Sequence, residues 1–168
     1  MTAFRLQFDP ALIGELAARF GYEDDAATQT AGRAAGARGH YTRDEFLLVC
    51  AWKTARSKPK VALNGETAVQ AATATALSAR DEGTRMEALT SLEGVGVPTA
   101  SVLLHFAFPD DYPILDRRAL ESLGCRARTT YPIGFWLDYL TACRELAARH
   151  GVSLRTLDKA LWQHSKER

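Results

Sequence analysis

The sequence is poor in three features that mark whole classes of protein. Its three cysteines, Cys50, Cys125 and Cys143, are odd in number and far apart, so we expect neither a disulfide framework nor a zinc site. No window alternates apolar and polar residues strictly, and aromatic residues are sparse, which argues against a β-sheet. No apolar run approaches membrane-spanning length, and residues 1–5 lack the apolar core of a signal peptide. We therefore expect a cytoplasmic protein that does not contact membranes.

The net charge is also small, since the chain has 21 basic and 20 acidic side chains and a formal charge of +1. This balance neither requires nor excludes a nucleic-acid partner, because affinity for nucleic acid depends on a local basic face. Two local groups of cations stand out, and each fits a phosphate-binding face as well as an ordinary solvated surface. They are Lys53, Arg56, Lys58 and Lys60, and Arg117, Arg118, Arg126 and Arg128.

The apolar residues that are present follow a helical period. With 46% apolar content, 168 residues can fill one core, so we expect a single compact all-α unit over residues 1–168. Residues 22–41 have few large apolar groups and indicate either a weak helix or a mobile loop. Residues 57–60 resemble a connector. The expected helices cover residues 10–20, 43–56, 66–79, 86–92, 98–106, 117–123, 134–150 and 154–162.

The most informative stretch is residues 86–123. At its centre an apolar helical pattern is interrupted by Gly94 and Gly96 and restarts at Pro98. Glycine tolerates positive φ, and proline suits the first turn of a helix, where its missing N–H has no intrahelical partner. We therefore expect two helices joined by a very tight turn, at about residues 86–106. The second helix would begin with unpaired N–H groups, which bind phosphate readily.

These residues resemble the helix-hairpin-helix DNA glycosylase superfamily, the fold of endonuclease III and its relatives. The resemblance rests on Leu-x-Gly-Val-Gly-x-x-Thr-Ala from Leu92, then an apolar helix, an Ala-Phe-Pro turn, and an apolar pair followed by Asp116. It implies an all-α, two-lobed fold of that type. It also implies that residues 86–123 contain the hairpin and the catalytic loop.

The resemblance further implies a catalytic residue and a reaction. In that superfamily an aspartate downstream of the hairpin acts at the glycosidic bond of a flipped nucleotide, and Asp116 matches it. Bifunctional members carry a catalytic lysine immediately before the hairpin threonine, and here that position is Pro98. Proline cannot form a Schiff base. We therefore expect a monofunctional DNA glycosylase of base excision repair, which hydrolyses the bond to a damaged or mismatched base.

The expected partner is double-stranded DNA, bound by a monomer. Trp52 and Tyr41 are candidate base-pocket residues, although a tryptophan on an apolar helix is more often part of the core. Tyr112 and Tyr131 are further aromatic candidates for nucleotide flipping. The expected DNA-binding residues are Gly94, Val95, Gly96, Val97 and Thr99 of the hairpin, and Lys53, Arg56, Lys58, Arg117 and Arg118.

No cofactor and no side-chain metal ligand is expected. The resemblance implies only a Na⁺ or K⁺ ion held by backbone carbonyls of the hairpin. Some superfamily members end in a four-cysteine iron–sulfur loop, but residues 159–168 contain no cysteine, so we expect no cluster.

Asp116 has a plainer interpretation as a helix N-cap, which stabilises a protein by about 1 kcal/mol. As a cap it would be held ionised by its hydrogen bonds and the helix dipole. The chain also reads Leu-Asp-Arg-Arg-Ala from Leu115, where the superfamily usually has Val-Asp-x-His-Val. Two other functions therefore stay open. One is a non-catalytic DNA-binding protein that recognises distorted DNA, and the other is a protein-interaction module.

Overall fold

The computed structural model describes residues 2–22 and 25–168, and over these ranges all regular structure is helical. This confirms the all-α prediction. The α-helices are α1 (Ile13–Ala18), α2 (Ala26–Arg38), α3 (Arg43–Lys53), α4 (Lys58–Val61), α5 (Glu66–Ser78), α6 (Glu82–Thr90), α7 (Val97–Ala107), α8 (Arg117–Ser122), α9 (Ile133–His150) and α10 (Leu154–Lys166). Short 3-10 helices occupy Pro10–Leu12 and Ala55–Ser57.

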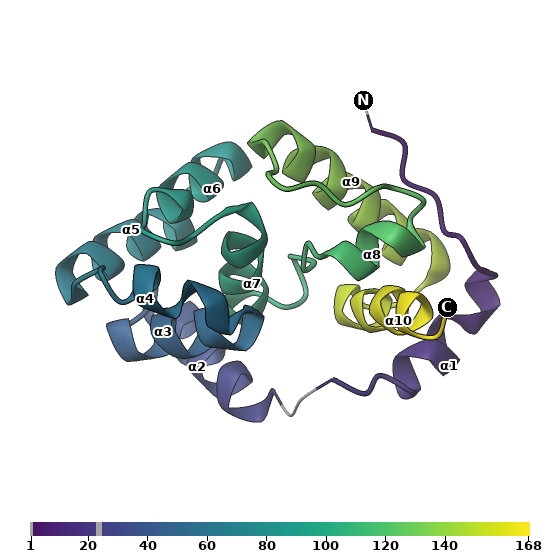
Figure 1. Ribbon diagram of the computed structural model, residues 1–168, viewed down its shortest axis with the longest axis horizontal. Helices are drawn as coiled ribbons and strands as arrows, with labels where there is room; N and C mark the ends of the chain where they lie inside the picture. The colour runs from purple at the N-terminus through teal and green to yellow at the C-terminus, as the bar shows by residue number, and fades with distance from the viewer. Residues whose placement is uncertain (1, 23–24) are drawn as a thin grey trace.

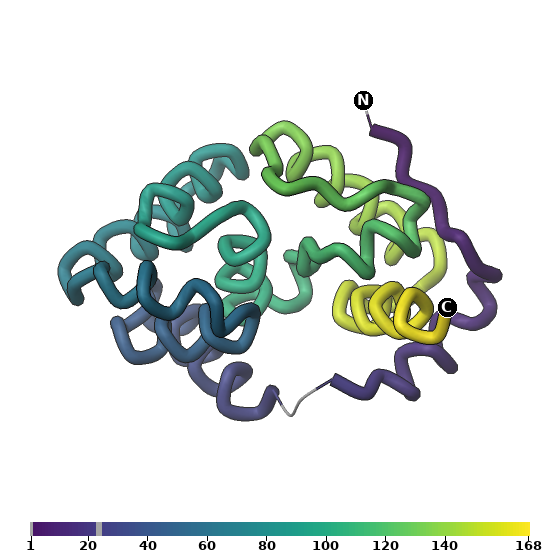
Figure 2. The backbone as a smooth tube through the Cα atoms, in the orientation of Figure 1, coloured from purple at the N-terminus to yellow at the C-terminus, as the bar shows by residue number. Residues whose placement is uncertain are grey.

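The helices lie in two groups (Figure 1). The first helical group contains α2 to α7, and the second contains α1 and α8 to α10. The N-terminal segment lies along the second group, where the Arg5 and Gln7 amides donate to the carbonyls of Leu123 (3.0 Å) and Ser122 (2.9 Å). Residues 108–116 lead from the first group to the second (Figure 2). The two ends of the chain therefore build the second group together.

For residues 22–41 the sequence leaves a weak helix and a mobile loop open, and the structure shows a helix over most of this range. Ala26–Arg38 is a regular helix, α2, that ends at Gly39. It packs against α7 through small residues, since a Cβ on Gly32 would lie only 2.2 Å from the Phe106 carbonyl oxygen. The scarcity of large apolar groups thus reflects close helix packing. Residues 23 and 24, which belong to the same prediction, lie outside the described residues.

Two other predicted boundaries also shift. The helix expected over residues 43–56 ends at Lys53, because Thr54 is extended. The connector expected over residues 57–60 is helical, since Ser57 ends a 3-10 helix and residues 58–60 belong to α4. The first hairpin helix begins at Glu82, earlier than expected, because the Asp81 carboxylate accepts a hydrogen bond from the Thr84 amide (2.7 Å) and caps it. Both shifts follow from local capping and dihedral preferences.

The second hairpin helix, α7, lies at the centre of the first group. Of its residues only Pro98 is not buried. It contacts α2, α3 and α6, and its C-terminal end leads into the segment that carries Asp116. Among the helices of residues 2–22 and 25–168, none is both long and apolar enough to cross a membrane.

Candidate functional site

The segment that leads to Asp116 is held in place by side chains from both helical groups. From α7, His105 donates from Nδ1 to the Tyr112 carbonyl oxygen (2.7 Å). From α9, the Tyr139 hydroxyl donates to the Ile114 carbonyl oxygen (2.7 Å). Both contacts are buried, where a lost hydrogen bond leaves a polar group unsatisfied.

Two further helices, α3 and α10, also hold this segment. The Leu115 amide donates to Ser101 Oγ of α7 (2.9 Å), and its carbonyl accepts from Lys53 Nζ of α3 (3.3 Å). The Ile114 amide donates to Asp158 of α10 (3.2 Å). Every backbone polar group of Ile114 and Leu115 is therefore bound by a side chain. The contacts come from α3, α7, α9 and α10, and together they fix where Asp116 begins.

Asp116 is the N-cap of α8, as the plainer interpretation predicts. One carboxylate oxygen accepts from the Ala119 amide (2.8 Å). The expectation that capping holds it ionised is incomplete, because burial raises the pKa of this carboxyl above its usual value. The Lys53 charge and the Ala119 amide lower the pKa, while Asp158 raises it further. Lys53 is therefore the cation that favours the carboxylate form.

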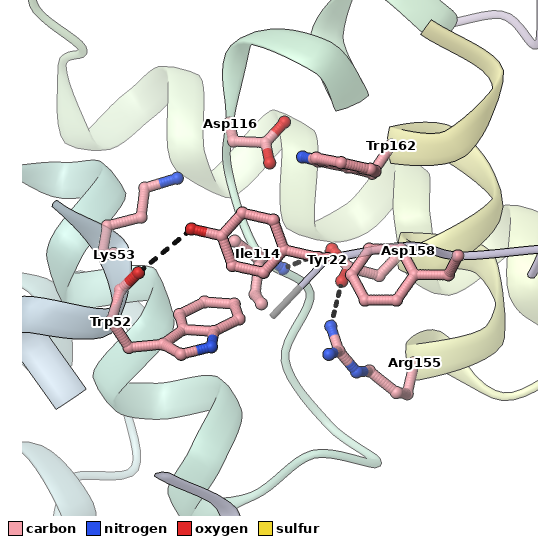
Figure 3. A pocket seen from close by; sticks show the side chains of 9 residues that line it. Tyr22, Trp52, Lys53, Ile114, Asp116, Arg155, Asp158 and Trp162 are labelled. Carbon is pink, nitrogen blue, oxygen red and sulfur yellow. Dashed lines mark hydrogen bonds and ion pairs between the residues drawn. The ribbon is translucent and has the colours of Figure 1, made fainter. Parts of the chain in front are cut away.

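Asp116 and Lys53 line a partly open pocket of about 150 Å³ where the two helical groups meet (Figure 3). A protein cavity of this size can hold an aromatic ring. The other walls are mainly aromatic, with one buried ion pair. They are formed by Phe20, Tyr22, Trp52, Ile114, Arg155, Asp158 and Trp162.

The ring of Tyr22 lies between the two indoles of the pocket (Figure 3). Its centroid is 5.2 Å from that of Trp52 and 5.4 Å from that of Trp162, and both contacts are edge-to-face. The Tyr22 hydroxyl donates to the Trp52 carbonyl oxygen (3.3 Å). Trp52, predicted as a base-pocket residue, thus lines the pocket, and its indole nitrogen is buried without a hydrogen-bond partner among the described residues.

Tyr41, the other predicted base-pocket residue, is in the wrong place for that role. It is completely buried in the first helical group, and its hydroxyl donates to the Leu103 carbonyl oxygen (2.6 Å). Tyr112 and Tyr131 also lie outside the pocket. Tyr112 donates to Glu82 (2.8 Å), and Tyr131 packs on Phe135.

Sequence reasoning missed the contribution of α10. Asp158 accepts from Arg155 (2.7 Å), which also contacts Asp25 (2.6 Å), and burial raises the pKa of Asp158. One signal was available. Asp158 lies on the buried face of α10 between Leu157 and Leu161, and a carboxylate among apolar residues is costly unless it is paired.

Outside the pocket, Asp116 and Lys53 also line an open groove of about 440 Å³. Its other walls are Thr54, Arg56, Pro98, Thr99, Arg117 and Arg118. A wider groove of about 1020 Å³ adjoins it, shares Thr54 and Arg56, and runs over Lys60 and residues 90–96 of the hairpin. Four of the predicted DNA-binding cations, Lys53, Arg56, Arg117 and Arg118, therefore lie on one continuous surface with the hairpin.

Three other cations of the two predicted basic groups do not line these grooves. Lys58 is exposed at the start of α4 but lines neither groove, and Arg126 lies at a separate hollow with Glu121. Arg128 stacks on Phe135, with 4.6 Å from its guanidinium carbon to the ring centroid. The second predicted basic group is thus divided between different surfaces.

The hairpin turn depends on Gly94. Its φ of +76° is left-handed, and a Cβ there would lie 2.8 Å from the Cβ of Lys60. Gly96, which as a glycine would also tolerate positive φ, is instead extended (φ −91°, ψ 179°). Nothing lies closer than 3.7 Å to a Cβ built on Gly96. Asn64 holds the turn from the side by accepting from the Glu93 amide and donating to its carbonyl, both at 2.9 Å.

The hairpin offers both donors and acceptors to a ligand. At the start of α7 the amides of Val97 and Thr99 have no hydrogen-bond partner within the described chain, and Gly96 supplies no side-chain cap. The carbonyl oxygens of Gly94 and Val95 likewise accept no hydrogen bond from the described residues. Carbonyl oxygens are ligands that suit a monovalent cation. No cluster of metal-binding side chains occurs in residues 2–22 and 25–168.

Comparisons of the chain with family models, with curated proteins and with solved structures find no match.

Proposed function

We propose that this protein is a monofunctional DNA N-glycosylase with the two-lobed helix-hairpin-helix fold, acting on a damaged or mismatched base in base excision repair. One observation carries the proposal. Asp116 and Lys53 are the two side chains common to the aromatic pocket and the open groove. If the flipped base lay in the pocket and its sugar in the groove, the glycosidic bond between them would lie beside the Asp116 carboxylate.

The grooves supply the means to bind double-stranded DNA. The free amides at the start of α7 and the positive end of its dipole would bind a backbone phosphate. Arg56 and Lys60 flank the hairpin, while Arg117 and Arg118 flank Asp116. These contacts position the duplex without reading its sequence.

Asp116 would act on the sugar after the nucleotide is flipped out of the duplex. As the glycosidic bond breaks, C1′ gains positive charge and the bonding electrons leave with the base. A fixed carboxylate stabilises that charge, as in other sugar hydrolases. Water then adds to C1′, and the proton that it loses passes to the departing base, which is released as the neutral species. Burial disfavours the ionised form of Asp116. The neighbouring Lys53 cation opposes this effect, because it favours the carboxylate form that the reaction needs.

The reaction would leave an intact abasic site. Pro98 has no side-chain amine, and the Lys53 ammonium donates a hydrogen bond to the Leu115 carbonyl oxygen. A Schiff base with the sugar is therefore not expected. Borohydride, which traps such an intermediate covalently, should yield no protein–DNA adduct during base release.

The decisive experiment needs no knowledge of the lesion. Duplex DNA that carries a cationic pyrrolidine abasic analogue mimics the charged transition state. Wild type should bind it more tightly than undamaged duplex, and Asp116→Asn should lose that preference. Asp81→Asn is the matched control, because Asp81 is also an N-cap aspartate but lies outside the pocket. Asparagine is a good N-cap, so both variants should fold.

A second function, DNA binding without catalysis, has one observation in its favour. Tyr22 occupies the space between the two indoles where a base would stack (Figure 3). Equal affinity for both duplexes, unchanged by Asp116→Asn, would replace the glycosylase proposal with a protein whose hairpin binds DNA and whose Asp116 only caps a helix. Absence of salt-sensitive DNA binding would instead indicate a protein-interaction module.

A further inference from the structure

A second pocket, of about 290 Å³, adjoins the candidate active site through Arg155, which lines both. Its other walls include Gln29 and Arg33 of α2, His105 and Phe106 of α7, and Lys159 of α10. The volume is at the small end of ligand sites. None of the residues that carry this inference lines the DNA-binding grooves, although His105 and Phe106 lie at the C-terminal end of the second hairpin helix.

The pocket holds positive charge that the described residues leave unneutralised. Arg155 is paired with Asp25 (2.6 Å) and Asp158 (2.7 Å). Arg33 and Lys159 form no ion pair or hydrogen bond with any residue in the described part of the chain, although Lys159 lies 5.6 Å from the centroid of the Phe20 ring. Cations that converge on a hollow favour an anionic ligand there.

His105 adds a hydrogen-bond acceptor to the same pocket. Its side chain is 1% exposed, and Nδ1 carries the proton because its partner, the Tyr112 carbonyl oxygen, can only accept. Burial, together with the charges of Arg155 and Lys159, lowers the pKa of His105 to about 4, so the ring is neutral near pH 7. Nε2 therefore presents a lone pair, and no described residue donates to it.

A ligand for this pocket must combine three features. It needs an anion for Arg33 and Lys159, an N–H or O–H donor for His105, and a flat apolar surface for the Phe106 ring. We propose that the pocket binds a small phosphate monoester of a ring compound, of the nucleoside monophosphate class. This site is independent of the proposed glycosylase activity.

Calorimetric titration of the full chain tests the proposal, with adenosine 5′-monophosphate as the probe. Adenosine without phosphate should bind much more weakly, and so should inorganic phosphate without the ring. Arg33→Gln and Lys159→Gln should each lower affinity about tenfold, since a hydrogen bond to a charged group contributes about 1.5 kcal/mol or more. Arg80→Gln is the control, because Arg80 is an exposed cation that does not line the pocket.

Two outcomes would overturn the proposal. One is that the monophosphate binds wild type and both pocket variants equally, or does not bind at millimolar concentration. The other concerns the source of the phosphate. If a short single-stranded oligonucleotide without terminal phosphate binds and is weakened by both variants, while the monophosphate does not bind, the pocket holds a DNA strand instead of a free ester.

Discussion

The Tyr139 hydroxyl donates a buried hydrogen bond of 2.7 Å to the Ile114 carbonyl oxygen, two residues before Asp116. This contact ties the second helical group to the segment that carries the candidate catalytic carboxylate. Tyr41 makes a contact of the same kind in the first group, to the Leu103 carbonyl oxygen at 2.6 Å. The two tyrosines therefore form a matched pair, one that positions the site and one that only stabilises the fold.

Tyr139→Phe and Tyr41→Phe should each lower the free energy of unfolding by about 1–3 kcal/mol, because each leaves a buried carbonyl without its donor. Only Tyr139→Phe should also reduce the preference for the abasic-analogue duplex. Urea denaturation measures the first effect and competition binding the second. If both variants reduced the preference equally, Tyr139 would have no positioning role beyond stability.

Lys53 should set the pH dependence of base release. Its charge lowers the pKa of Asp116, so Lys53→Gln should raise that pKa further and move the acid limb of the rate profile to higher pH. The glutamine amide can still donate to the Leu115 carbonyl. Lys58→Gln removes the same charge from a residue that lines neither the pocket nor the grooves, and its profile should match that of wild type.

The sequence predicts the parts of this site that depend on local chemistry. Asp116 as a cap, the turn before α7 and the basic end of α3 all follow from residue types at short spacing. The pocket itself depends on α10, which is far away in sequence. No short-range pattern shows that Asp158 and Trp162 would lie opposite Trp52.

For Tyr41 and α2, local sequence patterns do not indicate the structure that forms. An aromatic residue before a basic helix fits a base pocket as well as a core, and only the packing against α7 decides between them. Residues 26–38 lack large apolar groups because α7 packs closely against them. From periodicity alone, this scarcity of apolar residues indicates only a weak helix. In both cases a tertiary contact decides what local composition leaves open.

The two hairpin glycines should respond differently to substitution. Gly94→Ala should destabilise the fold by at least about 1–2 kcal/mol, because its backbone is left-handed and the new Cβ would meet Lys60. Gly96→Ala should change stability by less than about 0.5 kcal/mol, since the backbone is extended and the space is open.

If the hairpin binds phosphate, Gly96→Ala should nevertheless weaken DNA binding, and to a similar degree for all duplex sequences, because a phosphate must approach this backbone closely. Fluorescence anisotropy with several unrelated duplexes provides the measurement. Affinity that changed for one sequence only would rule out a backbone contact at Gly96.

His105 should make the fold sensitive to acid. Its pKa is lowered from 6.5 to about 4, so between these values the unfolded chain binds a proton that the folded protein does not. The stability that depends on neutral His105 is fully present above about pH 6.5 and is lost as the pH falls towards about 4. The loss amounts to about 3 kcal/mol, since one pKa unit corresponds to about 1.4 kcal/mol.

His105→Asn isolates this effect, because asparagine keeps an N–H donor for the Tyr112 carbonyl and does not titrate. Asp116 and Asp158 have raised pKa values and shift stability in the opposite direction, but they are present in both proteins. The difference in unfolding free energy between wild type and variant should therefore move in favour of the variant by about 3 kcal/mol between pH 7.5 and pH 4. A difference that stayed constant over this range would mean that His105 titrates normally and is not enclosed by α2, α7 and α10.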